Sequence, residues 1–342
     1  MKSTAKTRLR VQKLSQFLAG RSSLLIVMQD NPDPDAIAAA VALRKLANTL
    51  AGIQCSIAHG GTVGRGENRA LVRYLSLNLR QCNEIEFDKF DLTAMVDTQP
   101  GAGNNSFPPD CVPDIVFDHH PMRRATRRAQ FTDIRSGYGA TATILFEYLM
   151  QAGIAPDVPL ATALLYAIRS DTQDLGRQAT RRDIRAIGAL YSLSNQRMLS
   201  EIQRGEVQRG YYRLLTHALQ NAKVHGNCII TDLGEVEIPD MIGEVADLLL
   251  RDEGIYWTLC YGLFQGKLLL SIRTSQTEVS ADKIIRSIVA RRGTGGGHAS
   301  MAGGQIVLKT GNKAEVARIE KVIRQRFLNL VGAGEQPGEK LV

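Results

Sequence analysis

A short, wholly apolar run near the N-terminus constrains the fold more than any other feature of this sequence. Residues 24–28 read Leu-Leu-Ile-Val-Met and end at a polar loop, 29–35, which an alanine- and leucine-rich stretch at 36–50 follows. An uninterrupted apolar run of this kind is typical of a central strand of a parallel sheet, where both faces are buried. Strand, polar loop and helix in this order predict the opening of a βαβ unit.

The same alternation continues through the first part of the chain. Strands are expected at 53–58, 92–96 and 114–117, and helices at 8–19, 139–152, 159–169 and 180–191. This alternation predicts a parallel sheet with helices on both faces. Ligands of such sheets bind beyond the carboxyl ends of the strands, so polar residues that follow strands are the candidates for a site.

A second pattern begins after a connecting region at 195–221, which reads as one or two helices broken near Gly205 or Gly210. The expected strands are 224–231, 255–264 and 267–273, with a hairpin turn at Gln265-Gly266, and the expected helices are 240–251, 280–290 and 313–330. The fold class is therefore α/β: a parallel-sheet domain, then a smaller α/β domain with a mixed sheet. The predicted parts are an N-terminal helix at 1–21, the first domain at 22–194, connecting helices at 195–221, the second domain at 222–331 and a disordered tail at 332–342.

Charge and cysteine usage narrow the class of protein. The 342 residues carry a net charge of +8, and a positive field attracts polyanions such as nucleotides, nucleic acid or acidic lipid. The alternative is a basic globular protein without a polyanionic ligand. The 5 cysteines are scattered and form no CxxC pair, which favours a reducing cytoplasm over a disulfide framework or a zinc knuckle. No apolar run reaches the ~18–20 residues that a bilayer requires, so no stable membrane association is expected.

Acidic side chains follow several predicted elements, and all of them fall at the same edge of the predicted sheet. They are Asp33 and Asp35 after 24–28, Asp97 after 92–96, Asp118 with His119 and His120 after 114–117, and Asp171 after 164–168. Carboxylates buried together are costly unless cations neutralise them. Carboxylates with one or two imidazoles suit manganese or magnesium before zinc. Two such ions, roughly 3.5–4 Å apart, can share a water, lower its pKa and hold the hydroxide in line with a phosphorus.

Each cluster alone has an ordinary explanation. Asp35 and Asp171 could be helix caps, Asp97-Thr98 a loop turn, and His119-His120 surface histidines. Their shared place at one sheet edge favours a site.

Together these motifs resemble the DHH phosphoesterase family. The resemblance covers about residues 22–190, and the motifs occur in the family's order: Asn31-Pro-Asp-Pro-Asp35 with Ala-Ile-Ala-Ala-Ala40, Val96-Asp97-Thr98, Asp118-His119-His120-Pro121, and Arg169-Ser-Asp171-Thr172. The resemblance implies a role for each matched residue. Asp33 would bind a first divalent metal, Asp35, His119 and Asp171 a second, and Asp97 both; His120 would face the substrate phosphate and Asp118 would support the histidines. Two Mn²⁺ ions are expected, with Mg²⁺ as the alternative metal.

One position departs from the family pattern. The first motif usually opens with a histidine four residues before its first aspartate, and here that residue is Gln29. An amide oxygen can coordinate a hard cation but is a poorer ligand than an imidazole, so the first metal is expected to be held weakly. His59, the nearest histidine along the chain, is not expected to replace it.

A second signature is the glycine-dense segment at 291–304 around His298. Glycines let backbone N–H groups close on an anion, and the Ala/Met stretch that follows could open a helix whose N-terminus favours phosphate. The alternative is a flexible loop. Over about residues 220–330 the chain resembles the DHH-associated domain, whose Gly-Gly-Gly-His motif implies that Gly295, Gly296, Gly297 and His298 bind the nucleotide. Arg273 would grip phosphate, unless it is only a surface charge on a strand. The resemblance places the active site in the cleft between the domains.

Arginines form two further runs, one at Arg123, Arg124, Arg127 and Arg128 and one at Arg177, Arg181, Arg182 and Arg185. They are either a solvated face or a surface that attracts a phosphate backbone without reading sequence. Aromatic residues make up only 6% of the chain, so no long stacking track for single strands is evident, and Trp257 is expected in the core.

The second domain decides between the members of the family that this chain resembles. Pyrophosphatases lack the glycine-histidine loop, RecJ-type exonucleases are usually longer, and cyclic di-AMP phosphodiesterases often carry membrane and sensor segments. The chain therefore resembles the nanoRNase and pAp phosphatase class, which trims short oligonucleotides and removes the 3′-phosphate of adenosine 3′,5′-bisphosphate. The alternatives kept open are a cyclic-dinucleotide or longer single-strand phosphodiesterase and, because of Gln29, a nucleotide-binding regulatory module without turnover. A homodimer is also left open.

Overall fold

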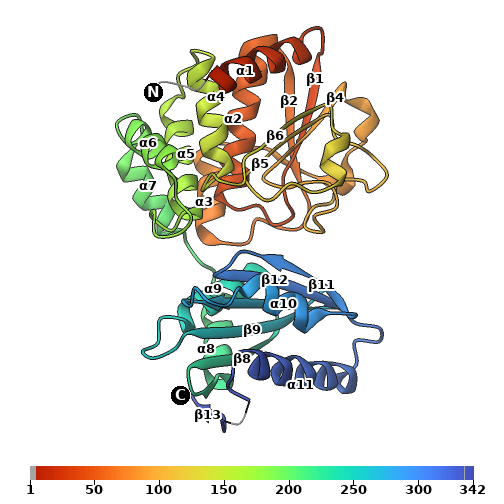
Figure 1. Ribbon diagram of the computed structural model, residues 1–342, viewed down its shortest axis with the longest axis vertical. Helices are drawn as coiled ribbons and strands as arrows, with labels where there is room; N and C mark the ends of the chain where they lie inside the picture. The colour runs from red at the N-terminus through yellow and green to blue at the C-terminus, as the bar shows by residue number, and fades with distance from the viewer. Residues whose placement is uncertain (1–4, 335) are drawn as a thin grey trace. The chain divides into compact units, whose positions relative to one another are not determined.

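The computed structural model describes residues 5–334 and 336–342 and divides the chain into two compact units, Met1–Glu206 and Val207–Val342. Each unit has its own sheet, and Figure 1 traces the chain through both.

The first unit is built on a 6-stranded sheet in which every pair of neighbouring strands is parallel, in the order β3-β2-β1-β4-β5-β6. The strands are β1 (Ser23–Val27), β2 (Gln54–His59), β3 (Leu79–Gln81), β4 (Leu92–Val96), β5 (Ile115–Asp118) and β6 (Phe131–Ile134). The parallel sheet confirms the prediction, whereas the short β3 and β6 were not expected. The chain grows to one side through β2 and β3 and then returns to β4, so the strand order reverses between β1 and β4. Ligands of open parallel sheets bind at such a reversal.

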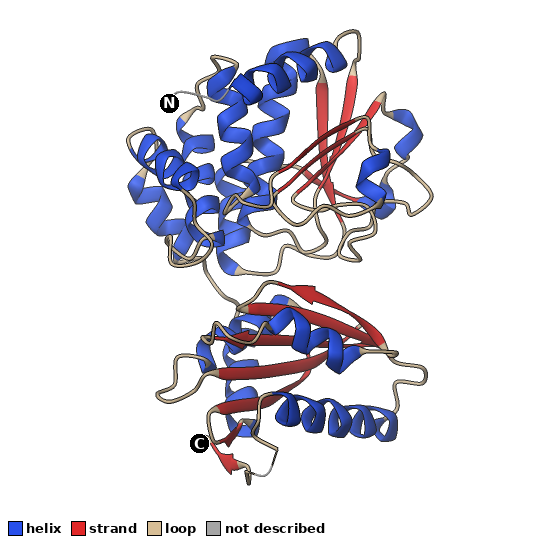
Figure 2. Cartoon of the chain, in the orientation of Figure 1, coloured by secondary structure: helices blue, strands red, loops and turns tan. Residues whose placement is uncertain are grey.

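The two faces of this sheet are covered differently. The helices are α1 (Ala5–Leu18), α2 (Pro34–Ala51), α3 (Gly66–Tyr74), α4 (Thr141–Gln151), α5 (Val158–Asp171), α6 (Arg181–Tyr191) and α7 (Gln196–Gln203), and Figure 2 shows them gathered on one side of the strands. Leu24 and Ile26 of β1 join the core under these helices, while Leu25 and Val27 face a second core with Phe107. The expectation of helices on both faces is therefore wrong for this unit. Loops and the short 3₁₀ helices Cys82–Glu84 and Phe87–Lys89 cover the second face. Both 3₁₀ helices belong to the connection from β3 to β4, and the loop after β4 adds Phe107.

The second unit has a 7-stranded sheet in the order β11-β12-β10-β9-β8-β7-β13. The sheet is mixed, which confirms the predicted fold class of this unit. Its strands are β7 (Lys223–His225), β8 (Cys228–Glu235), β9 (Trp257–Phe264), β10 (Lys267–Thr274), β11 (Gly293–Gly297), β12 (Met301–Val307) and β13 (Glu339–Lys340). β8 and β9 are parallel, and the remaining neighbours are antiparallel. Gln265 and Gly266 have φ of 46° and 74°, which confirms the tight hairpin turn between β9 and β10.

Helices pack on both faces of this mixed sheet. α8 (Arg209–Asn221) and α9 (Asp240–Leu249) contribute to one apolar core, and α10 (Ala281–Val289) and α11 (Lys313–Leu330) contribute to the other. Trp257 is 3% exposed, which confirms its expected place in the core.

Three expectations for the second unit need correction. A turn at Gly226, with φ of 57°, splits the expected strand 224–231 into β7 and β8. The glycine-dense segment forms the hairpin β11–β12, so the stretch after His298 is a strand and opens no helix. Glu339–Lys340 of the expected disordered tail pairs with β7, and the backbone N–H of Leu341 donates to the carbonyl oxygen of Ala222 at 3.1 Å.

Among the described residues, no helix has both the length and the apolar character needed to cross a bilayer.

Candidate metal centre

The acidic and histidine side chains that the sequence singled out converge at the carboxyl edge of the parallel sheet. Asp97 directly follows β4, Asp118 ends β5, and Asp171 is the last residue of α5. Ligand-type atoms lie within 4.8 Å of one another in two groups: Asp97, Asp118, His119 and His120 form one, and Asp35, His119 and Asp171 form the other. His119 belongs to both groups, so segments far apart in the sequence meet at a single buried place.

His119 is held in an orientation that suits a metal ligand. Its Nδ1 lies 3.2 Å from the carbonyl oxygen of Tyr138, so Nδ1–H donates there and the lone pair falls on Nε2. Nε2 lies 3.1 Å from Asp171 Oδ2 and 3.6 Å from Asp97 Oδ1. Within the described residues, Asp171 Oδ2 is buried and accepts no hydrogen bond.

His120 and Asp118 form a charge-assisted pair beside this group. His120 Nδ1 lies 2.8 Å from Asp118 Oδ1, and Gln99 Nε2 donates to the other carboxylate oxygen at 2.7 Å. Burial alone would raise the pKa of Asp118, but the hydrogen bond from His120 and its charge bring the pKa below its usual value. Burial acts in the opposite sense on His120, yet Asp118 raises the pKa of the imidazole overall. The pair therefore favours an imidazolium whose side chain is 36% exposed.

The remaining carboxylates repel one another. Burial, followed by the charges of Asp171 and Asp33, raises the pKa of Asp35. Burial, followed by the charges of Asp35 and Asp33, raises the pKa of Asp97, and burial is also the main cause of the raised pKa of Asp171. Buried, mutually repelling carboxylates with an imidazole nitrogen and one oxygen lacking a hydrogen bond are a donor set that fits hard divalent cations.

Asp35 does not cap its own helix, and Asp97 has an uncommon backbone conformation. Asp97 has φ of 57°, a left-handed conformation that is uncommon outside glycine and often found at functional sites. The N-cap of α2 is Asp33, whose Oδ1 accepts from the backbone N–H of Ala36 at 2.9 Å. Asp35 instead accepts from the N-terminus of another helix, α4.

The segment 138–143, which we call the clasp, orients the Asp35 and Asp97 carboxylates by hydrogen bonds. Backbone N–H groups of Thr141 and Ala142 donate to the Asp35 carboxylate at 2.7 and 2.8 Å, and Thr141 Oγ1 donates to Asp97 at 3.0 Å. Asp183, which is fully buried, fixes the clasp in turn. It accepts from the Gly139 backbone N–H at 3.0 Å and from a clasp hydroxyl, Thr143 Oγ1, at 2.6 Å.

Sequence reasoning missed the clasp, Asp183 and Gln99. The only signal for the clasp was a run of small residues, Gly-Ala-Thr-Ala-Thr, at the start of the expected helix 139–152.

The residues expected at the first metal are assembled less completely. Among the described acidic, histidine and cysteine residues, Asp33 does not belong to the two groups of close ligand atoms. Asp33 nevertheless lies near the cluster. Its negative charge is the third-largest cause of the raised pKa of Asp97, behind burial and the charge of Asp35. The oxygen of Gln29 accepts from Asn104 Nδ2 at 3.1 Å.

In the second unit, Arg273 and His298 lie at the same end of the mixed sheet. Arg273 of β10 is opposite Met301 of β12, and the His298 backbone N–H donates to the Met301 carbonyl oxygen at 2.7 Å. Arg273 is 8% exposed, so the alternative of a surface charge is wrong. Its Nε donates to Asp247 Oδ1 at 2.5 Å and its Nη1 to Ser271 Oγ at 2.6 Å.

The glycines of the hairpin allow close packing of a helix. A Cβ on Gly295 or Gly304 would come within 2.9–3.3 Å of side-chain atoms of Ile285 and Val289 of α10. The backbone N–H of Asp282, in the first turn of α10, donates to the carbonyl oxygen of His298 at 3.2 Å. The structure therefore gives close helix packing as one reason for glycine at these two positions.

The arginine runs differ in their surroundings. The first run follows the Asp118-His119-His120 motif along the chain, and all of its side chains are exposed: Arg123, Arg124, Arg127 and Arg128. In the second run Arg182 lies 3.4 Å from the buried Glu147 carboxylate, so it serves an internal ion pair.

Comparison with known proteins matches both units. Residues 23–168 match the model of the DHH family, N-terminal domain, and residues 225–327 match the model of the DHHA1 domain. An uncharacterised protein of Methanocaldococcus jannaschii is 34% identical over 322 residues, which are 92% of this chain and 66% of that protein. The chain thus spans 66% of the length of that curated relative.

Solved structures show the same fold. An exopolyphosphatase-related protein from Bacteroides fragilis is similar over 95% of this chain and 98% of its own, with a TM-score of 0.72 and 15% identity. RecJ from Thermus thermophilus, solved with Mn²⁺, is similar over 94% of this chain and 55% of its own, with a TM-score of 0.54 and 17% identity. At these identities the likeness is one of fold.

Proposed function

The chain belongs to the DHH family and carries a DHHA1 domain after its DHH N-terminal domain, and from that premise we propose that it is a metal-dependent phosphoesterase of short oligonucleotides or small nucleotides. The observation that carries this proposal is the convergence of Asp35, Asp97, His119 and Asp171 at one buried edge of the sheet. Carboxylates kept together in this way need cations, and a phosphate ester is the substrate class that paired cations suit.

Two divalent ions, Mn²⁺ before Mg²⁺, are the proposed cofactors. Asp35, His119 and Asp171 would hold one, Asp33 with a weak contribution from Gln29 the other, and Asp97 both. When bound, the ions supply a hydroxide at neutral pH and offset the charge of the phosphate. The Thermus RecJ structure solved with Mn²⁺ supports the choice of metal by its shared fold.

The protein's own groups position the substrate around this centre. His120, kept protonated by Asp118, would donate to a phosphate oxygen from its more exposed edge. The clasp holds the Asp35 and Asp97 carboxylates by hydrogen bonds, and the Tyr138 carbonyl oxygen orients the His119 ring with Nε2 toward Asp97 and Asp171. In the second unit the proposed nucleotide contacts are Arg273, Gly295, Gly296, Gly297 and His298.

The substrate proposed first is that of the nanoRNase and pAp phosphatase class. The test is a panel of a dinucleotide, adenosine 3′,5′-bisphosphate, cyclic dinucleotides and a long single strand, each incubated with protein and Mn²⁺. Release of mononucleotide or phosphate from the first two is expected. A panel without any hydrolysis would overturn the proposal, whereas preference for cyclic or long substrates would select one of the alternatives.

Asp97→Ala and His298→Ala should separate the roles of the two units. Loss of nearly all activity is expected for Asp97→Ala, because this carboxylate contacts the centre directly. His298→Ala should mainly raise KM. Equal loss of bound metal in both variants would contradict this division.

A nucleotide-binding regulatory module remains the second candidate, and the engagement of Gln29 by Asn104 favours it. Gln29→His should then raise the Mn²⁺ affinity and, if the enzyme proposal holds, lower the Mn²⁺ concentration needed for hydrolysis. Nucleotide binding without hydrolysis in both forms would select the regulatory module. The cytoplasm stays the proposed location, and a homodimer stays a proposal.

A further inference from the structure

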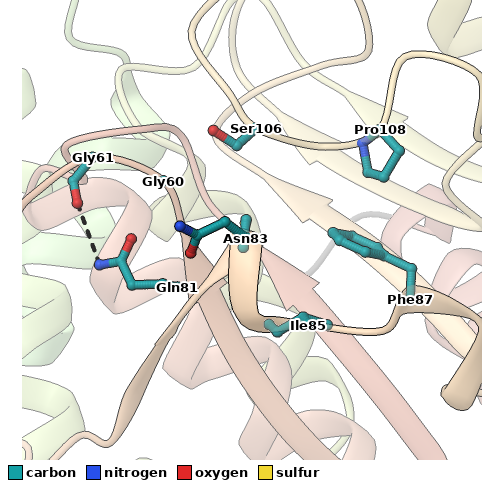
Figure 3. Close-up of a pocket in the computed structure, with 9 residues that line it drawn as sticks. Gly60, Gly61, Gln81, Asn83, Ile85, Phe87, Ser106 and Pro108 are labelled. Atoms are coloured by element: carbon teal, nitrogen blue, oxygen red, sulfur yellow. Dashed lines mark hydrogen bonds between the residues drawn. The ribbon is translucent and has the colours of Figure 1, made fainter. Parts of the chain in front are cut away.

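A pocket of about 420 Å³ lies beside the loops that follow β2 and β3, on the face of the parallel sheet that loops cover. Figure 3 shows the residues that line it: Gly60, Gly61, Gln81, Cys82, Asn83, Ile85, Phe87, Ser106 and Pro108. A volume of this size is in the range of pockets that hold small organic ligands, roughly 300–1,000 Å³.

The chemistry of the lining selects a class of ligand. None of the lining residues is charged, so the pocket offers no cation to a phosphate. Ile85, Phe87 and Pro108 supply apolar and aromatic surface, while Asn83 and Ser106 supply groups for hydrogen bonding. The Asn83 side chain is exposed at the pocket, so its amide can exchange hydrogen bonds with water for hydrogen bonds with a ligand. A flat, uncharged group with polar edges, such as a nucleobase, fits this lining.

Three loops, those after β1, β2 and β4, approach one another closely at the wall of the pocket. A Cβ on Gly60 would lie 2.1 Å from Asp30 Oδ1 and 2.3 Å from Ser106 Oγ, so any larger residue would displace these side chains. Ser106 Oγ donates to Asp30 Oδ2 at 3.0 Å, but within the described residues Asp30 Oδ1 is buried without a hydrogen bond. The carboxylate further disfavours an anionic ligand here.

The pocket is connected to the candidate metal centre by a short piece of chain. Asp30 lies between Gln29 and the loop that carries Asp33, and its backbone N–H donates to the Asn104 carbonyl oxygen at 2.7 Å. β2, which leads to Gly60, is two strands from β4, which leads to Asp97. With strands spaced about 4.8 Å apart, that separation is roughly 10 Å across the sheet to the Gly60 side of the pocket, and Asn83, which follows β3, lies one strand further away. One nucleotide can bridge such a span between its phosphate and its base.

We propose that this pocket is a nucleobase subsite of the first unit, which receives the base next to the phosphate held at the metal centre. The inference rests on the proposed function, because it assumes a nucleotide substrate. It explains how a centre built for phosphate would select nucleotides over simple phosphate esters.

The test uses the full chain, with Asn83→Ala to remove one contact and Asn83→Trp to fill the pocket. Asn83 is exposed, so neither change disturbs the core. Gln203→Ala, which removes an exposed amide on α7, is the matched control. Binding of a fluorescent nucleoside, 2-aminopurine riboside, is measured without metal. KM is measured with Mn²⁺ for a dinucleotide and for its analogue with an abasic site.

Nucleoside binding by the wild type, lost in Asn83→Trp and kept in Gln203→Ala, is the expected result. KM for the dinucleotide should rise about tenfold in Asn83→Ala, as the loss of one hydrogen bond implies, and KM for the abasic analogue should not change. Absence of nucleoside binding, or equal effects of Asn83→Trp on both substrates, would overturn the subsite. Nucleoside binding that Asn83→Trp removes, in a protein that hydrolyses neither substrate, would support the subsite and contradict the proposed function alone.

Discussion

The Asp97 carboxylate is buried beside those of Asp35, Asp33 and Asp118, and this crowding defines the molecule at the scale of single residues. Without a cation, each ionised carboxylate disfavours the next, and the folded state binds protons more tightly than the unfolded chain does. The same carboxylates become favourable once a divalent ion lies among them. The centre thus links metal binding, protonation and folding.

This linkage gives a dependence of stability on pH for the metal-free protein. The pKa values of Asp35, Asp97 and Asp171 are raised in the folded state above their usual 3.8. The folded state therefore binds more protons than the unfolded one above that pH, and the free energy of unfolding falls as the pH rises through this window. Thermal unfolding with a chelator present should show a higher Tm at pH 5 than at pH 7.5. Asp118, whose pKa is lowered, contributes stability that is lost only as the pH falls below its usual 3.8, so it does not affect the comparison between pH 5 and pH 7.5.

Asp97→Asn tests the repulsion between the buried carboxylates, because it removes one negative charge and keeps the size of the side chain. The variant should unfold at a higher temperature than the wild type at pH 7.5 without metal, by a few degrees, since about 1 kcal/mol moves Tm by ~2–4 °C in a unit of this size. The difference should shrink at pH 5. A variant that is less stable than the wild type at pH 7.5 would contradict the repulsion.

The sequence identifies the carboxylates and histidines of the centre because they directly follow apolar runs, a local pattern. It does not identify the residues that orient them. Asp35 receives its hydrogen bonds from residues 106 and 107 positions away, and Asp183 reaches Gly139 over 44 positions. Such partners are set by the packing of α4 against α2 and of α6 against α4, which no local pattern encodes.

At the scale of elements, the clasp connects the N-terminus of α4 to the candidate centre. Asp183→Ala removes its support of the clasp and its half of the α6 capping box, whereas Thr180→Ala removes only the half that the Thr180 hydroxyl supplies. Both variants should lose stability, about 0.5–2 kcal/mol for the cap. Only Asp183→Ala should also lose Mn²⁺ affinity, by about 10–100-fold, because partners that orient metal ligands have effects of this size. Titration with Mn²⁺ checks this, and equal affinities in the two variants would show that the clasp has no positioning role.

The hairpin β11–β12 offers a test of what its glycines do. Gly304→Ala places a methyl group 2.9 Å from Ile285 and 3.1 Å from Val289, and overpacking of this kind costs about 1–3 kcal/mol. The neighbouring Gly303→Ala meets only the Leu270 carbonyl oxygen, at 3.8 Å, and should be tolerated. Chemical denaturation of the two variants measures the difference. Similar losses in both would argue against close helix packing as the reason for glycine at 304.

The hairpin also shows why some elements escape prediction. Glycine has a low strand propensity, and β11 contains little else, so only pairing with β12 makes it a strand. β3 and β6 are too short to show a periodic pattern. By contrast, β1, β4 and the long helix α11 carry strong patterns and were located within a residue or two.

At the scale of the whole molecule, each unit has its own hydrophobic core. Calorimetry should therefore show two unfolding transitions. Mn²⁺ should raise the unfolding temperature of the first unit alone, because this unit holds the candidate ligands. At a Mn²⁺ concentration one hundred times Kd, the free energy of unfolding of this unit should rise by about 2.7 kcal/mol. Asp97→Asn should reduce that shift, which assigns the transition. A shift of both transitions would contradict the placement of the centre in one unit.

The two-unit organisation and the fold class were readable from the sequence, because the change from parallel βα alternation to hairpins is a change of pattern. The covering of one sheet face by loops was not, since Leu25 and Val27 look equally apolar under a loop or a helix.

The central claim is that carboxylates from separate segments share divalent ions at one centre. Titration of Mn²⁺ into the wild type and Asp97→Asn, followed by electron paramagnetic resonance, tests it most directly. Two Mn²⁺ per chain with mutual magnetic coupling in the wild type, and loss of the coupling in Asp97→Asn, is the result that this account predicts. Failure of the wild type to bind Mn²⁺, or binding that Asp97→Asn leaves unchanged, would contradict it.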